Sequence, residues 1–91
     1  MSKRLEAVVS GRVQGVSFRY YTQRKAMELG VVGWVRNESD GTVRTVAEGE
    51  ESALRGFREF LDKGPPYAEV TSVEEHWKEA TGEFERFRIT H

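Results

Sequence analysis

The sequence predicts an α+β fold in which one antiparallel sheet carries two helices on the same face. Segments of alternating apolar side chains indicate strands, and two segments with apolar side chains at helical spacing lie between them. Glycine and proline residues end most segments. The predicted order is strand, helix, strand, strand, helix, strand, with a short last strand. Two right-handed βαβ units of this kind form a split, ferredoxin-like sandwich.

The first strand and helix follow from their apolar patterns. Leu5, Ala7 and Val9 alternate, so a strand is predicted over 5–10. A loop over 11–18 leads into a helix over 19–29, which Gly30 can end by adopting positive φ. The apolar stripe of this helix consists of Phe18, Thr22, Ala26 and Leu29.

A hairpin follows the first helix. Residues 31–37 are β-branched and aromatic, which favours a second strand. The Asp40-Gly41 pair tolerates the positive φ of a tight turn, so the chain is expected to return as a third strand over 42–48. Its inward side chains are predicted to be Val43, Thr45 and Ala47.

The second half repeats the helix and strand pattern. A helix is predicted over 50–63, ended by Gly64 and two prolines, with a buried stripe of Ala53, Leu54, Phe57, Phe60 and Leu61. A strand over 67–77 is expected to turn one face inward, formed by Ala68, Val70, Ser72 and Glu74. A loop at 79–83 precedes the last strand, which is predicted over 84–90. The sequence does not predict at which edge of the sheet this strand lies.

The glycine loop is the first candidate functional segment: Gly11, Arg12, Val13, Gln14, Gly15, Val16, Ser17, Phe18 and Arg19. A glycine-bearing turn at a helix start exposes unpaired N–H groups beside the positive end of the helix dipole, which favours phosphate. Arg19 adds a permanently charged, fork-shaped donor. The segment is not a P-loop, because no Gly-Lys-Ser/Thr follows.

Asn37, the only asparagine, is the second candidate. In a split βαβ unit the first and second strands run parallel with the third between them. The glycine loop and Asn37 therefore follow the ends of two strands at the same edge of the sheet. We expect Arg19 and Asn37 to be neighbours despite their separation in sequence.

These residues suit one kind of chemistry. Arg19 and backbone N–H groups could stabilise a phosphoryl group, and Asn37 could orient a water molecule. No side-chain nucleophile is expected in reach, since there is no cysteine, His76 is expected near the surface and His91 at a frayed terminus. Such a site suits a leaving group that needs no protonation, such as a carboxylate. The residues therefore predict metal-free hydrolysis of a carboxylic–phosphoric anhydride by water.

Three motifs resemble the acylphosphatase family. They are Gly11-x-Val13-Gln14-Gly15-Val16-x-Phe18-Arg19, Gly33-Trp34-Val35-x-Asn37 and Asp40-Gly41-x-Val43. The resemblance implies a single domain over 1–91 that hydrolyses acyl phosphates, with Arg19 binding substrate and Asn37 orienting water as the catalytic residues. It also implies that the substrate's phosphate takes the proton from water. Glu38 departs from the neutral residue of many relatives, but strand alternation should turn it away from Asn37.

Composition excludes several other classes. The net charge of −1 argues against a nucleic-acid partner held by bulk electrostatics. The lack of cysteine excludes disulfides and thiol nucleophiles, and no apolar run is long enough for a membrane span. We expect a cytoplasmic monomer without cofactor or metal. Scarce amides beside many Glu, Arg and Lys side chains lean toward heat adaptation.

Two alternatives compete with a stand-alone enzyme. A non-catalytic ferredoxin-like module could bind a small anion as a sensor, and turnover of an acyl phosphate would distinguish the two. RNA binding through the sheet is disfavoured, because the aromatic strand motif of such domains is absent. A related domain also begins larger maturation proteins that handle carbamoyl phosphate, and we expect the stand-alone form here.

Overall fold

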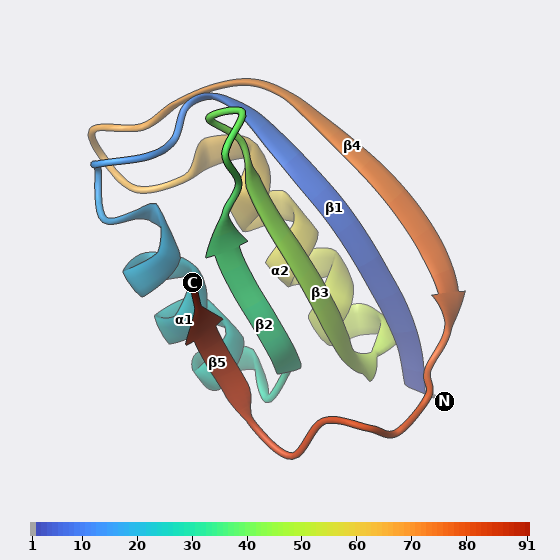
Figure 1. Cartoon of the computed structure of the whole chain (residues 1–91). Helices are drawn as coiled ribbons and strands as arrows, with labels where there is room; N and C mark the ends of the chain where they lie inside the picture. Colours follow the sequence, from blue (N-terminus) through green and yellow to red (C-terminus); the bar gives the residue numbers. More distant parts are fainter. Residues whose placement is uncertain (1) are drawn as a thin grey trace.

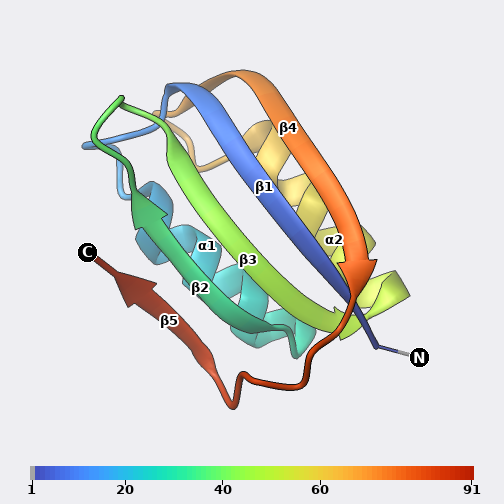
Figure 2. The ribbon, with the colours of Figure 1, turned by 45° about the vertical axis from the view of Figure 1, so that its right-hand side comes forward.

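The computed structural model describes residues 2–91 as one five-stranded sheet with two helices (Figure 1). The elements, in chain order, are β1 (Ser2–Arg12), α1 (Phe18–Leu29), β2 (Val32–Asn37), β3 (Val43–Glu50), α2 (Glu51–Lys63), β4 (Glu69–Glu79) and β5 (Phe87–Thr90). This is the predicted order. Both helices lie on the same face of the sheet (Figure 2), so the ferredoxin-like prediction is confirmed.

The sheet has the order β4-β1-β3-β2-β5. β3 pairs antiparallel with both β1 and β2, so β1 and β2 run in the same direction with β3 between them. β5 takes the edge beside β2 and pairs with it in parallel, which is the one departure from the predicted antiparallel sheet among residues 2–91. Both views place the loop after β1 and the turn after β2 at the same end of the sheet.

The core lies between the sheet and the helices. The predicted inward residues of β1 and β3 are buried, and so are Leu54, Phe57 and Leu61 of α2. The ring centroid of Phe57 in α2 lies 5.7 Å from that of Phe87 in β5, so this strand contacts α2 on the face of the sheet that the helices cover. Each fully buried Leu or Phe side chain contributes about 1.5 to 3 kcal/mol to folding.

The predicted inward face of β4 is wrong over half its length. The pairing of β1 with β4 shifts register between Ser10 and Gly11, which is a β-bulge. Before the shift Val70 lies opposite Gly11, and after it Val73 lies opposite Val9. Ala68, Val70 and Val73 pack against the core, whereas the expected inward residues Ser72 and Glu74 are exposed.

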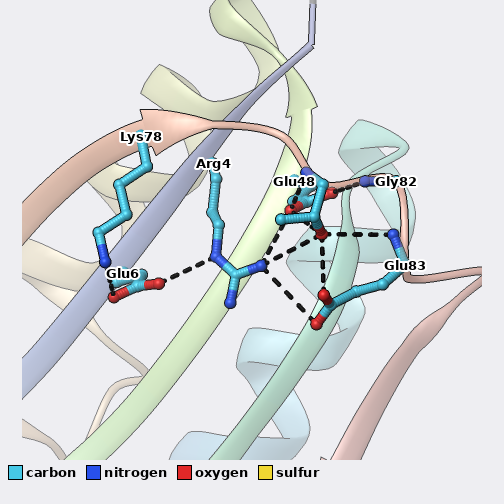
Figure 3. Close-up of polar contacts among 7 residues, drawn as sticks. Arg4, Glu6, Glu48, Lys78, Gly82 and Glu83 are labelled. Carbon is cyan, nitrogen blue, oxygen red and sulfur yellow. Dashed lines mark hydrogen bonds and ion pairs between the residues drawn. The ribbon is translucent and has the colours of Figure 1, made fainter.

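β5 is shorter than predicted, and a buried carboxylate holds the segment before it. Glu48 of β3 is 3% exposed, and its carboxylate accepts hydrogen bonds from the backbone N–H groups of Thr81 and Gly82 at 2.9 and 3.0 Å (Figure 3). Arg4 donates to the same carboxylate at 3.1 Å. We call Arg4, Glu48, Thr81 and Gly82 the Glu48 cluster; it fixes the connection from β4 across to β5.

Candidate active site

The glycine loop joins the end of β1 to the start of α1 in a conformation that leaves the helix uncapped. Gly15 has φ +76° and Ser17 has φ +62°, and Ser17 is the only residue other than glycine with positive φ in the described chain. Ser17 occupies the N-cap position, yet its side chain makes no capping hydrogen bond, and the first turn holds no acidic residue. The positive end of α1 therefore has no compensating anion of its own.

Arg19 lies in this first turn, where a cation opposes the helix dipole. Its Nη1 is 3.4 Å from the backbone oxygen of Thr90 and 3.1 Å from Nδ1 of His91. His91, which the sequence placed at a frayed terminus, therefore contacts the end of the glycine loop. The reason is the position of β5, which the sequence left open: at the β2 edge, its end meets the start of α1.

A cavity of about 400 Å³ lies in front of these groups, and we call it the site cavity. Its lining includes both Arg19 and Asn37, so the predicted juxtaposition of these two residues is confirmed. Asn37 is the last residue of β2, and the glycine loop follows β1 at the same sheet end. The full lining is Val13, Gly15, Ser17, Phe18, Arg19, Tyr20, Asn37 and Ile89.

Four residues of the glycine loop do not line the site cavity. Gly11 belongs to the bulge beside β4, where a Cβ would lie 2.1 Å from the Glu69 oxygen. Arg12 is exposed and 3.9 Å from the Glu69 carboxylate. Val16 packs against the core. The remaining residue, Gln14, is partly buried and outside the cavity lining.

The Gln14 side chain instead links the glycine loop to the β2–β3 turn. Its Nε2 donates to the backbone oxygens of Glu38 at 2.8 Å and Thr42 at 2.9 Å. The same turn is stabilised by Asp40, which accepts from the Thr42 hydroxyl and backbone N–H; these bonds lower the pKa of the Asp40 carboxyl. Gln14 thereby fixes the loop that carries Arg19 relative to the strand that carries Asn37.

Glu38 lies on the opposite face from Asn37, as alternation predicts. Its carboxylate is 3.3 Å from Nη2 of Arg36, and the Arg36 guanidinium stacks 4.8 Å above the Trp34 ring. The negative charge of Glu38 is thus paired outside the site cavity. A carboxylate after Asn37 is compatible with an anionic ligand in that cavity.

Sequence reasoning missed two residues of the cavity. Tyr20 lines the cavity while remaining 51% exposed. Its position directly after Arg19 in the sequence is the signal that could have identified it as a cavity residue. Ile89 was assigned only to the last strand, and its place became evident once β5 was found beside β2. They add one aromatic and one aliphatic side chain to a lining that already contains Val13 and Phe18.

Comparison with known proteins gives the family. The family model described as Acylphosphatase matches residues 5–89. The chain belongs to the acylphosphatase family. Members of this family are hydrolases that act on acyl phosphates, and the chain is accordingly an enzyme of this class.

Relatives and solved structures agree along nearly the whole length. An acylphosphatase of Salinibacter ruber is 51% identical over 87 residues, covering 96% of this chain and 92% of the relative. One of Pelotomaculum thermopropionicum is 48% identical over 86 residues, covering 94% of each. The crystal structure of acylphosphatase from Bacillus subtilis superposes with a TM-score of 0.94 at 38% identity, covering 98% of this chain and 99% of that one. Acylphosphatases thus share both the sequence and the fold of this chain.

Within residues 2–91, two other kinds of site are absent. Neither helix is long and apolar enough to cross a membrane. No three or more His, Asp or Glu side chains within these residues gather as a group that could hold a metal ion.

Proposed function

We propose that the site cavity hydrolyses acyl phosphates by direct attack of water on phosphorus, without a metal or a covalent intermediate. The phosphoryl group binds between Arg19 and the backbone N–H groups at the start of α1, and Asn37 orients the attacking water. The observation that carries this proposal is the shared cavity of Arg19 and Asn37 at an uncapped helix N-terminus.

The chemistry fits the groups that are present. The water oxygen forms a bond to phosphorus, the bond from phosphorus to the acyl oxygen breaks, and its electron pair leaves on the carboxylate. The proton lost by water goes to a phosphate oxygen of the substrate, so no protein base is needed. A carboxylate leaves as a stable anion, since its conjugate acid has a pKa of about 4. Arg19 and the N–H groups stabilise the charge on the phosphoryl oxygens.

Replacing Arg19 and Arg12 in parallel tests whether Arg19 binds the phosphoryl group. Both belong to the glycine loop, but only Arg19 lines the site cavity. We expect Arg19→Ala to lower kcat/KM for acetyl phosphate by about 100-fold or more, because a charge-assisted donor to the phosphoryl group is lost. Arg12→Ala should change it by less than about twofold.

The assay uses acetyl and benzoyl phosphate, with and without a chelator. Turnover that a chelator abolishes would contradict the metal-free reaction. Binding of inorganic phosphate without any turnover would support an anion sensor instead. Equal loss in both arginine variants would show that net charge matters rather than the place of Arg19.

The proposal extends to a monomer of one domain over residues 1–91 that works in the cytoplasm and does not bind nucleic acid. The near-neutral net charge argues against a nucleic-acid partner held by bulk electrostatics. The scarcity of Asn and Gln supports heat adaptation. Light scattering of the purified protein measures its mass, and a thermal unfolding midpoint below about 65 °C would contradict heat adaptation.

A further inference from the structure

The end of β5 lies against the first turn of α1. Gln23 of α1 donates from Nε2 to the backbone oxygen of Phe87 at 3.0 Å, which attaches the start of β5 to the helix. At the other end of β5, Nη1 of Arg19 is within reach of the Thr90 oxygen and of Nδ1 of His91. The same helix therefore contacts both ends of this short strand.

The direction of the Arg19–His91 contact can be deduced from the two groups. A guanidinium carries only donors, so Nδ1 of His91 must be the acceptor at 3.1 Å. The imidazole is then neutral, with its proton on Nε2. His91 is not part of the lining of the site cavity, whereas Arg19 is. Any effect of His91 on a ligand in the cavity therefore passes through Arg19.

The contact uses one edge of the guanidinium. Both acceptors, on Thr90 and His91, are bound by Nη1. In the part of the chain that the structure describes, Nε and Nη2 of Arg19 have no hydrogen-bond partner. A free arginine side chain has about 2 kcal/mol of rotamer entropy to lose on binding. Anchoring it at Nη1 removes part of that cost and leaves the three N–H groups of Nε and Nη2 for an anion.

We propose that His91 is a positioning residue for Arg19. Its neutral imidazole accepts from Nη1 and, with the Thr90 oxygen, orients the guanidinium toward the phosphoryl group of the substrate. This inference rests on the proposed phosphate-binding role of Arg19.

Three variants test the role of His91. His91→Leu removes the acceptor while keeping a side chain of similar bulk. His91→Asn keeps an acceptor, because Oδ1 of asparagine occupies nearly the same place as Nδ1 of histidine. His76→Leu is the matched control, since His76 is exposed on β4 and outside the site cavity. His91 is itself exposed and beyond the end of β5, so its variants should fold.

The readouts are the dissociation constant of inorganic phosphate and the KM and kcat for acetyl phosphate. Losing one hydrogen bond should raise the dissociation constant and KM together by about three- to tenfold in His91→Leu. The value of kcat should change by less than about twofold, because the residue acts on binding. His91→Asn should restore the wild-type constants, and His76→Leu should match wild type.

Other results separate the two proposals. If the wild-type protein binds no phosphate and turns over no acyl phosphate, the proposed function fails. If wild type is active but His91→Leu has unchanged constants, only the positioning role fails. It fails equally if His91→Asn is as impaired as His91→Leu, because ring shape rather than the acceptor would then matter.

Discussion

The side-chain nitrogen of Gln14 lies 2.8 Å from the backbone oxygen of Glu38, although the two residues belong to different connections of the fold. A second bond, to the oxygen of Thr42 at 2.9 Å, joins the same nitrogen to the other side of the turn. One amide group thus connects the loop that carries Arg19 with the end of the strand that carries Asn37. Correct spacing between the two depends on this group.

Gln14→Glu should lower the activity on acetyl phosphate. The substitution keeps the size of the side chain but places a carboxylate against two carbonyl oxygens, so two hydrogen bonds become repulsions. We expect a fall in kcat/KM of about tenfold, equivalent to about 1.4 kcal/mol, because the two halves of the site separate. Steady-state kinetics at neutral pH provides the measurement.

Thr45→Val is the control for Gln14→Glu. The Thr45 hydroxyl donates to the oxygen of Trp34 at 2.7 Å, and the residue is fully buried but outside the site cavity. Its loss should lower the free energy of unfolding by about 1 kcal/mol without changing KM. Equal kinetic constants for Gln14→Glu and wild type would rule out the positioning role of Gln14.

Asn37→Ala should separate binding from turnover. Asn37 lines the site cavity at the end of β2, and its proposed partner is water rather than phosphate. The dissociation constant of inorganic phosphate should change by less than about threefold, while kcat falls by about 100-fold or more. Titration calorimetry and steady-state assays measure the two quantities. Full turnover in this variant is the outcome that would sink the assigned role.

Glu48→Gln should destabilise the protein and weaken the attachment of the segment before β5. Burial of the Glu48 carboxyl raises its pKa, but hydrogen bonds from the Thr81 and Gly82 backbone N–H groups, the Thr81 hydroxyl and Arg4 outweigh this, and the net pKa is lowered. The neutral amide accepts these bonds at only one atom, so we expect a loss of about 2 kcal/mol in the free energy of unfolding. Urea denaturation at pH 7 measures it.

The same carboxylate gives the protein a defined pH dependence. Because the pKa of Glu48 is lower in the folded protein than its ordinary value of 4.5, its stabilisation is present above that value. It is lost as pH falls through the folded pKa. Between pH 5 and 3, wild type should therefore lose more stability than Glu48→Gln, while the exposed Glu85→Gln variant should follow wild type. Identical slopes for wild type and Glu48→Gln would contradict this account.

Gly33→Ala should be far more destabilising than Gly30→Ala. Both positions have positive φ, +144° and +73°, but a Cβ on Gly33 would lie 1.9 Å from the oxygen of Val46, whereas one on Gly30 meets no atom within 4 Å. Strain alone should cost Gly30→Ala about 1 to 2 kcal/mol, and the clash should raise the cost of Gly33→Ala to about 3 to 5 kcal/mol. Equal unfolding midpoints for the two variants would contradict the close approach of β2 and β3.

Local patterns were sufficient to predict most elements. Alternation at Leu5, Ala7 and Val9 places three side chains on one face of any strand, and the structure buries all three. The helical spacing of Leu54, Phe57 and Leu61 likewise predicted one inward face of a helix, and all three side chains are buried. The inward face of β4 was mispredicted, because alternation assumes unbroken pairing, and the bulge opposite Ser10 and Gly11 depends on another strand.

The sequence by itself determined the order of elements, the glycine loop at a helix start, and the meeting of Arg19 with Asn37. All three follow from periodicity, turn chemistry and the handedness of βαβ connections, which are local or general rules. Only the tertiary structure decided that β5 joins β2 and that His91 reaches Arg19. The connection that leads to that edge is held by buried Glu48, which accepts bonds from residues 33 and 34 positions away, and no local pattern encodes such contacts.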